Sequence, residues 1–244
     1  MELRVVNSSS AGNAFALDSG SEILLLEAGC RMADVKRAIN FRLADVVGCL
    51  CSHAHSDHAK YATEFAKFGV KVYCNQDVAD KKQFPYGSCH VMKQGKTVDI
   101  GSFRVAPIEL HHDVPNNGYL IHHDSCGTIL FALDTYKLDF NIMGVDHWII
   151  EANYDDRILK ANVQDGKIDR AQANRLMLSH MSIDNTVRFL RDCEADKSKT
   201  ITLCHLSERN SDTEMFRKTV AGAFGVPVFI ASKGTIVELN KEEI

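Results

Sequence analysis

The sequence has few prolines, no excess of positive charge and no long apolar run, and these shortages exclude several kinds of protein. No stretch approaches the roughly 18 consecutive apolar residues that a membrane-spanning helix needs. The chain also starts without the charged segment, apolar run and small-residue cleavage site of a secretory signal. We therefore expect a cytoplasmic protein that makes no contact with a membrane.

Charge and cysteine content narrow the chemistry further. The formal net charge of −4 provides no overall positive field for nucleic acid, so any such contact must depend on a local patch or on metal ions. The eight cysteines include no C-x-x-C pair, which argues against a cysteine-based structural zinc site. Without a secretory signal, we expect reduced and mostly buried thiols. Cys49 and Cys51 alternate in an apolar run, as core residues of a strand do.

The order of the expected elements indicates a layered α/β fold. Strands come in two batches and are interleaved with helices, which favours two sheets packed together and covered by helices outside. The expected strands are 3–7, 14–18, 22–27, 46–51, 70–74, 103–110, 119–121, 129–133, 147–151 and 200–204, with others near Val228 and Ile236. The expected helices are 33–40, 58–67, 168–178, 185–193 and 213–223. No repeat or Pro/Gly-rich linker marks a domain boundary.

The strongest functional signal is the run His-Ala-His-Ser-Asp-His at residues 53–58, directly after an apolar strand. His53 and His55 project to the same side of an extended chain, so they can share one metal ion. Asp57 and His58 are adjacent and can share a second ion only where the chain turns, as it does between a strand and a helix. Three histidines and an aspartate in this position match a metal site better than a solvated loop.

This run resembles the HxHxDH signature of the metallo-β-lactamase superfamily. The resemblance implies an α/β fold, a four-layer αββα sandwich, formed by one domain over residues 1–244. It implies two divalent transition-metal ions, with His53 and His55 on one, and Asp57 and His58 on the other. Zinc is favoured over manganese because histidine-rich, carboxylate-bridged sites suit zinc, although manganese is compatible.

Later segments match the remaining ligand motifs in the expected order, each after a predicted strand. The His-His-Asp segment supplies His112 as third ligand of the first ion, with His111 as the alternative. The Phe-Ala-Leu-Asp-Thr segment supplies Asp134 as the bridging residue, and the Cys-His-Leu-Ser segment supplies His205 for the second ion. One position departs from the family pattern. Glu27 stands where an aspartate is usual, which changes the expected geometry of a residue that supports the metals.

Four further stretches resemble the bacterial YycJ/WalJ-like branch of the superfamily: Ser-Ser-Ser-Ala-Gly-Asn at 8–13, Glu-Ala-Asn-Tyr-Asp at 151–155, Ser-His-Met-Ser at 179–182 and His-Leu-Ser-Glu-Arg-Asn at 205–210. This branch is related to ribonuclease Z and to the cyclic phosphodiesterases of phosphonate metabolism. The resemblance implies a phosphodiesterase or nuclease, for example a DNA exonuclease, that cleaves a phosphodiester of DNA, RNA or a smaller molecule with a metal-bridging hydroxide. The alternative is hydrolysis of another ester, a thioester or a lactam.

Two residues are the catalytic candidates. Asp57 would orient the nucleophile in addition to binding one ion. His180 lies outside the predicted ligand set and could bond a phosphate oxygen or protonate a leaving group. An equally weighted interpretation places this segment at a helix N-terminus, with Ser182 as the N-cap. Asn153 and Asn210 are candidate polar supports, and the sequence leaves the oligomeric state open.

Overall fold

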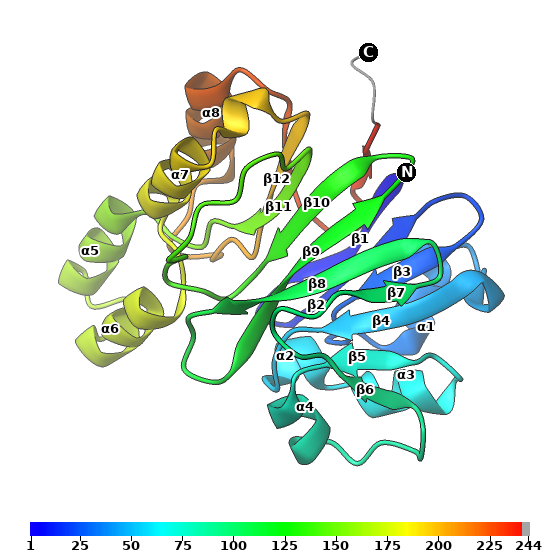
Figure 1. Ribbon diagram of the computed structural model, residues 1–244. Helices are drawn as coiled ribbons and strands as arrows, with labels where there is room; N and C mark the ends of the chain where they lie inside the picture. Colours follow the sequence, from blue (N-terminus) through cyan, green and yellow to red (C-terminus); the bar gives the residue numbers. More distant parts are fainter. Residues whose placement is uncertain (241–244) are drawn as a thin grey trace.

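The computed structural model describes residues 1–240, in which two seven-stranded mixed sheets lie face to face (Figure 1). The first sheet has the order β14-β1-β2-β3-β4-β5-β6 and consists of β1 (Glu2–Ser9), β2 (Gly12–Asp18), β3 (Ile23–Leu26), β4 (Val46–Cys51), β5 (Val72–Cys74), β6 (Cys89–Val91) and β14 (Ile236–Glu238). The second has the order β13-β12-β11-β10-β9-β8-β7 and consists of β7 (Val98–Ile100), β8 (Phe103–Leu110), β9 (Asn116–His123), β10 (Gly127–Ala132), β11 (His147–Glu151), β12 (Thr200–Cys204) and β13 (Val228–Ile230).

Helices cover the outer face of each sheet (Figure 1). They are α1 (Met32–Ala38), α2 (Ser56–Ala59), α3 (Ala62–Lys67), α4 (Gln76–Lys81), α5 (Asp156–Gln164), α6 (Arg170–Ser179), α7 (Ile183–Asp192) and α8 (Thr213–Phe224), with single 3₁₀ turns at Leu43–Asp45 and Ala195–Lys197. None of the helices within residues 1–240 is long and apolar enough to cross a membrane.

Three apolar clusters hold the layers together. The cluster between the sheets includes Phe15 of β2 and Phe131 of β10, whose rings meet edge to face at 5.6 Å. A second cluster joins the first sheet to α1 and α3 through residues such as Phe65. A third joins the second sheet to α7 and α8 around Trp148 and Phe216. The alternating apolar residues of the strands supply both faces of each sheet, and the predicted αββα sandwich is confirmed.

The sheet topology brings several strand ends to one edge. Strands β3 to β6 are mutually parallel, and so are β10 to β13. Parallel strands present their carboxyl ends together, which is where α/β folds build their sites. The chain leaves β4, β10 and β12 just before His53, Asp134 and His205 respectively. The fold therefore positions segments that are distant in sequence around one cleft.

The helix predicted over 58–67 is wrong, because the structure divides it into α2 and α3. The amide of Ala28 donates to the carbonyl of His58 at 2.7 Å, and the amide of Tyr61 donates to the carbonyl of Ala28 at 2.8 Å. These bonds to the loop after β3 replace bonds that a continuous helix would make. The interruption holds the histidine-rich turn against the neighbouring loop.

The sequence interpretation also missed α4, α5, β6 and β7. Helix α5 has nine residues, and its apolar contacts come mainly from Leu159 and Val163, one turn apart, beside the buried polar Asn162. It packs with α6 through a small separate cluster that contains Leu159, Ile168 and Ala173. The two helices stand together at the side of the molecule, next to α7 (Figure 1). Residues 241–244 lie outside the described residues, so one domain over 1–244 stays a prediction.

Candidate metal centre

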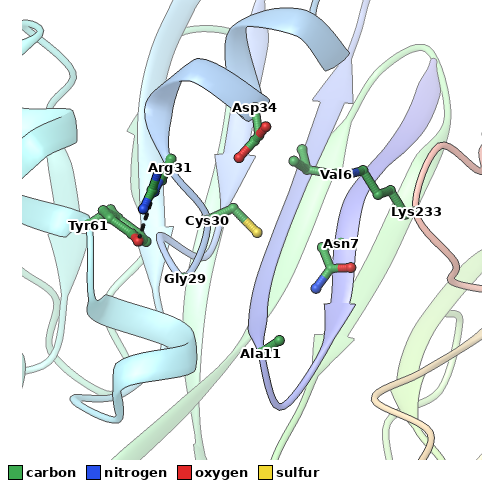
Figure 2. A pocket seen from close by; sticks show the side chains of 9 residues that line it. All are labelled: Val6, Asn7, Ala11, Gly29, Cys30, Arg31, Asp34, Tyr61 and Lys233. Carbon is green, nitrogen blue, oxygen red and sulfur yellow. Dashed lines mark hydrogen bonds between the residues drawn. The ribbon is translucent and has the colours of Figure 1, made fainter. Parts of the chain in front are cut away.

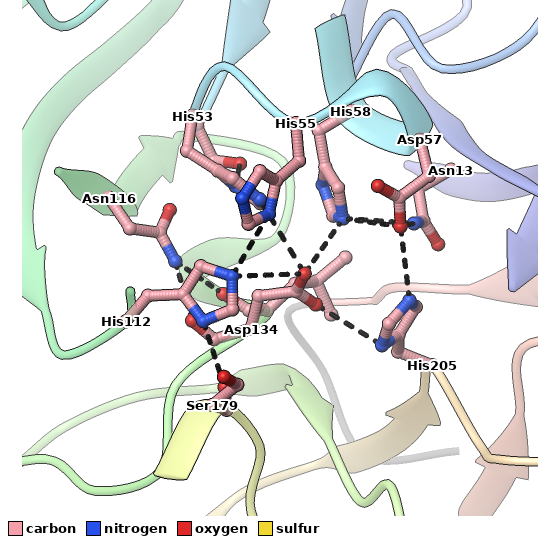
Figure 3. A network of polar contacts seen from close by, with 12 residues as sticks. Asn13, His53, His55, Asp57, His58, His112, Asn116, Asp134, Ser179 and His205 are labelled. Carbon is pink, nitrogen blue, oxygen red and sulfur yellow. Dashed lines mark hydrogen bonds and ion pairs between the residues drawn. The ribbon is translucent and has the colours of Figure 1, made fainter. Parts of the chain in front are cut away.

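The seven residues predicted as metal ligands meet in two groups that share Asp134 (Figure 3). One group consists of His53, His55, His112 and Asp134, and the other of Asp57, His58, His205 and Asp134. Within each group, one ligand atom from every residue lies within 4.8 Å of the others. The structure thus brings together both predicted sets, while the binding of metal by these side chains stays a prediction.

Asp134 lies at the centre of the cluster. Its Oδ2 atom is 3.1 Å from His58 Nε2 and 3.6 Å from His53 Nε2, and its Oδ1 atom is 3.1 Å from His205 Nδ1. The residue adopts φ 55°, a left-handed conformation that aspartate tolerates better than most residues. Asn116 Nδ2 donates to the carbonyls of Leu133 and Asp134, at 3.0 and 2.7 Å. These bonds hold the carboxylate in a position to contact both ligand groups.

Hydrogen bonds behind the cluster fix two of the imidazole rings. His53 Nδ1 is 2.9 Å from Ser52 Oγ, and His112 Nδ1 donates to the carbonyl of Ser179 at 2.9 Å. In each ring the opposite nitrogen, Nε2, faces Asp134. Engagement of one ring nitrogen sets the tautomer and leaves the other nitrogen free to bind a metal. His111, the alternative to His112, lies away from the cluster and pairs with Asp139 at 2.6 Å.

Glu27 supports the site from behind, despite being one methylene longer than the usual aspartate. It follows β3 in a left-handed conformation with φ 66°, and its side chain is fully buried. Its Oε1 atom is 3.4 Å from His58 Nδ1, and its Oε2 atom accepts a hydrogen bond from the amide of Ser52 at 3.2 Å. Glutamate therefore reaches the ring of a predicted ligand and also Ser52, the residue that links β4 to the run at residues 53–58.

The donor set fits two transition-metal ions. His53 Nε2 and His205 Nε2 are buried and have no hydrogen-bond partner within residues 1–240. A buried polar atom without a partner is costly, about 2 kcal/mol or more, unless a cation takes the place of that partner. Imidazole nitrogens and carboxylate oxygens in this arrangement are typical ligands of zinc and similar metals. We conclude that these residues can hold two metal ions.

The cluster also carries protons that metals would displace. Burial opposes a charge on His205, but the nearby carboxylates of Asp134, Asp57 and Glu151 outweigh it and raise its pKa to about 10. The pKa of His58 is raised well above its usual range against the same opposition from burial, mainly by Asp134 and Glu27. Burial lowers the pKa of His53 well below its usual range. Because metals bind neutral imidazole, metal uptake must release protons.

Asp57 and Asn13 close the cluster on the side of the second group. Asp57 Oδ2 is 3.4 Å from His58 Nε2 and 3.5 Å from His205 Nε2. Asn13 Nδ2 lies 3.0 Å from His58 Nε2 and 3.5 Å from Asp57 Oδ2. The loop at Gly29 passes so close that a Cβ there would lie 1.7 Å from the carbonyl oxygen of Asp57. Only glycine permits this close contact between the loop and α2, and the contact keeps α2 next to the site.

His180 lies beside the second group and is paired with Glu151. His180 Nδ1 is 2.6 Å from Glu151 Oε1, and the same oxygen is 3.2 Å from His205 Nδ1. Burial opposes the charge on His180, but Glu151 and Asp134 outweigh this effect and raise its pKa. Ser182 Oγ also accepts a bond from the amide of Asn185 at 3.3 Å, so the predicted N-cap exists as well. The capping interpretation and a functional His180 are therefore compatible.

Glu151 is the residue of the site to which the sequence analysis gave no role. Its side chain is fully buried at the end of β11, and its Oε2 atom accepts a bond from the amide of Thr135 at 3.0 Å. The available signal was a charged residue directly after the apolar residues 148–150 of β11. Asn153 was expected as a polar support, and its Nδ2 atom donates to the carbonyl of His205 at 2.7 Å.

The cluster opens into a cavity of about 370 Å³, whose walls include His55, Asp57, His112, His180 and His205. A separate cavity of about 220 Å³ is lined by Cys30, Arg31, Tyr61 and other residues, none of which is a histidine (Figure 2). Arg31 Nε donates there to Tyr61 Oη at 3.4 Å, and burial raises the pKa of the Cys30 thiol to about 11. A thiol with so high a pKa is a poor nucleophile, so the histidine-lined cavity is the candidate active site.

Known proteins resemble this chain in both sequence and fold. The exodeoxyribonuclease WalJ of Streptococcus pneumoniae is 26% identical over 232 residues, which cover 88% of this chain and 85% of that protein. The metallo-β-lactamase fold protein YhfI of Bacillus subtilis superposes with a TM-score of 0.77 at 17% identity, over 97% of this chain and 99% of its own. The short form of human tRNase Z gives a TM-score of 0.63 at 15% identity, over 98% and 99%.

The region that carries the ligands also matches a family description. Residues 24–205 match the β-lactamase superfamily domain, and this span includes every predicted ligand from His53 to His205. The predicted family is therefore confirmed, and the chain belongs to the β-lactamase superfamily.

Proposed function

We propose that this protein is a metal-dependent phosphodiesterase that acts as a nuclease. The observation that carries the proposal is the pair of ligand groups that share Asp134, beside the His180–Glu151 pair, in one cavity. The name of the pneumococcal relative, an exodeoxyribonuclease, and that of the human tRNase Z agree with this class of reaction.

The proposed metal ligands are those of the two groups, with zinc preferred to manganese. Ions held by these residues would lower the pKa of a bound water to about 7 and would neutralise charge on a phosphoryl group. Asp57, which is 18% exposed, accepts a hydrogen bond from the attacking water and so orients it. His180, held at Nδ1 by Glu151, presents Nε2 to the leaving oxygen and donates a proton there. We further propose that the protein works in the cytoplasm.

Metal analysis combined with a substrate comparison tests this function. Purified protein should contain about two transition-metal ions per chain and should hydrolyse bis(p-nitrophenyl) phosphate and oligonucleotides. A thioester and a chromogenic lactam, assayed with the same preparation, should be hydrolysed far more slowly. Protein that contains tightly bound metal but prefers the thioester or the lactam would contradict the proposal, and so would protein without bound metal.

A further inference from the structure

A trough leads away from the metal centre, between the loop after β12 and the helices α5 and α6. The cavity at the metals continues into a second one of about 440 Å³, and the two share Ser10, Gln172, Leu176, His180 and His205 in their walls. A third cavity of about 530 Å³ shares Arg209 with the second. The five shared residues join the first two cavities into one trough, and Arg209 stands at its far end, next to the third cavity.

The distal part of the trough offers positive charge. Arg209 lines both the second and the third cavity, and its exposed side chain forms no ion pair within residues 1–240. Lys167 lines the third cavity and pairs with Asp165 at 2.9 Å, but both side chains are more than half exposed, so the pair is weak. Glu208 lies on the same wall. Attraction of an anion would therefore depend on a direct contact with Arg209 and not on the net charge of the wall.

The backbone that carries Arg209 is firmly held. Asn162 Nδ2 donates to the carbonyl of Arg209 at 2.8 Å and to Asn210 Oδ1 at 2.9 Å. The amide of Asp155 donates to the carbonyl of Asn210 at 2.8 Å. The same short loop begins at His205, a predicted metal ligand. Arg209 consequently stands in a fixed relation to the metal centre, and α5 supplies the anchor through Asn162.

The lining of the trough suits a sugar–phosphate chain better than it suits bases. Ser9, Ser10 and Ser207 supply polar groups, and Ile168 and Leu176 supply apolar surface. No Phe, Tyr or Trp side chain lines the second and third cavities, and the two imidazole rings there, His180 and His205, belong to the metal centre. Bases therefore have no stacking platform along the rest of the trough. Contacts to phosphate and sugar position a nucleic acid without reading its sequence.

We propose that this trough binds the nucleotides next to the scissile bond of a single-stranded polynucleotide, with Arg209 in contact with a backbone phosphate. The inference rests on the proposed phosphodiesterase function and assigns it an extended substrate. A single strand is favoured because Asp134 and His205, which are only 2% and 4% exposed, require the scissile phosphate to enter the cavity. Arg209 is an arginine of the trough without an ion pair within residues 1–240, which suits contact with one phosphate backbone and not with the two backbones of a duplex.

Removal of the Arg209 charge tests the trough. In Arg209→Gln, kcat/KM for a single strand of about ten nucleotides should fall about tenfold, because one charge-assisted contact to phosphate is lost. Bis(p-nitrophenyl) phosphate is too small to span the trough, so the loss on it should be much smaller. Arg188→Gln removes the same charge from an exposed arginine that lines a different cavity, and it should behave as the wild type on both substrates.

A binding measurement separates this inference from the proposed function. The affinity of the metal-loaded wild type for a fluorescent phosphorothioate strand, measured by anisotropy, should depend on salt with a slope that Arg209→Gln reduces by about 0.7. Equal losses on both substrates, or unchanged affinity and salt slope in Arg209→Gln, would overturn the trough. A wild type that binds the strand through Arg209 but hydrolyses no phosphodiester would retain the trough and refute the proposed function.

Discussion

Replacement of His180 by alanine should lower the rate strongly on substrates with a basic leaving group and only slightly on substrates with an acidic one. The His180 ring is held by Glu151 at 2.6 Å and lies 3.8 Å from Asp134 Oδ1, next to the predicted bridging position. The raised pKa of His180 keeps a proton available in the metal-free protein, and Glu151 orients the ring. General-acid catalysis contributes about 10²- to 10⁴-fold to a rate. We expect a loss of this size on an oligonucleotide, whose leaving group is a basic alkoxide.

The same variant should lose much less activity on bis(p-nitrophenyl) phosphate, because p-nitrophenolate is a stable anion that leaves without a proton. The assay is kcat for both substrates, with metal content measured on the same preparation. His180 belongs to neither predicted ligand group, although it also clusters with Asp134, Glu151 and His205. Metal content should be unchanged if His180 donates a proton, and a loss of metal would show that it is a ligand instead. Equal losses on both substrates would show that His180 binds a phosphate oxygen instead. Unchanged rates would return His180 to a purely structural role beside the Ser182 cap.

Three other perturbations test separate parts of the structure. Asp134→Ala should remain folded by circular dichroism but should lose metal and nearly all activity, since one carboxylate contacts both groups; near-wild-type activity would exclude the dinuclear site. Glu27→Gln should weaken metal binding about 10- to 100-fold, as loss of a carboxylate behind a ligand histidine commonly does; an unchanged affinity in a chelator competition would contradict this. Burial lowers the pKa of His147 to about 4, whereas an unfolded histidine titrates near 6.5. The unfolded chain then binds more protons, so stability should fall by up to about 3 kcal/mol as the pH decreases from 6.5 to 4. His147→Gln should flatten that dependence in urea titrations, and an equally steep curve would refute it.

The residues that the sequence predicts as ligands lie together in the structure, and they could be singled out because their motifs are local. The run at residues 53–58 places four ligand candidates within six positions, directly after a strand that its apolar pattern identifies. Asp134 and His205 each follow an apolar strand as well. The structure brings all of them together because parallel strands end at a common edge. The local sequence pattern identifies the candidate residues, and the sheet topology places them at one edge of the double sheet.

The parts that escaped prediction depend on contacts between distant segments. Glu151 faces His180 only because the turn between α6 and α7 packs against the end of β11, where the amide of Asn153 donates to the carbonyl of Met181 at 2.9 Å. The anchor of Arg209 is a hydrogen bond from Asn162 of α5 to a backbone carbonyl 47 residues further along the chain. A bond between segments so far apart leaves no local pattern in either of them.

Backbone strain at the site explains why these strand ends are suited to function. Glu27, Asp134 and His205 all have positive φ, at 66°, 55° and 54°, and each directly follows a strand or comes within two residues of its end. A left-handed conformation costs a non-glycine residue about 1–2 kcal/mol, and glycine would remove that cost at each position. Glycine would also remove the carboxylate or imidazole that the turn aims at the cluster. The surrounding sheets and the Asn116 and Asn153 side chains hold these turns in place, so the stability of the double sheet maintains strained but preorganised side chains around the predicted metal site.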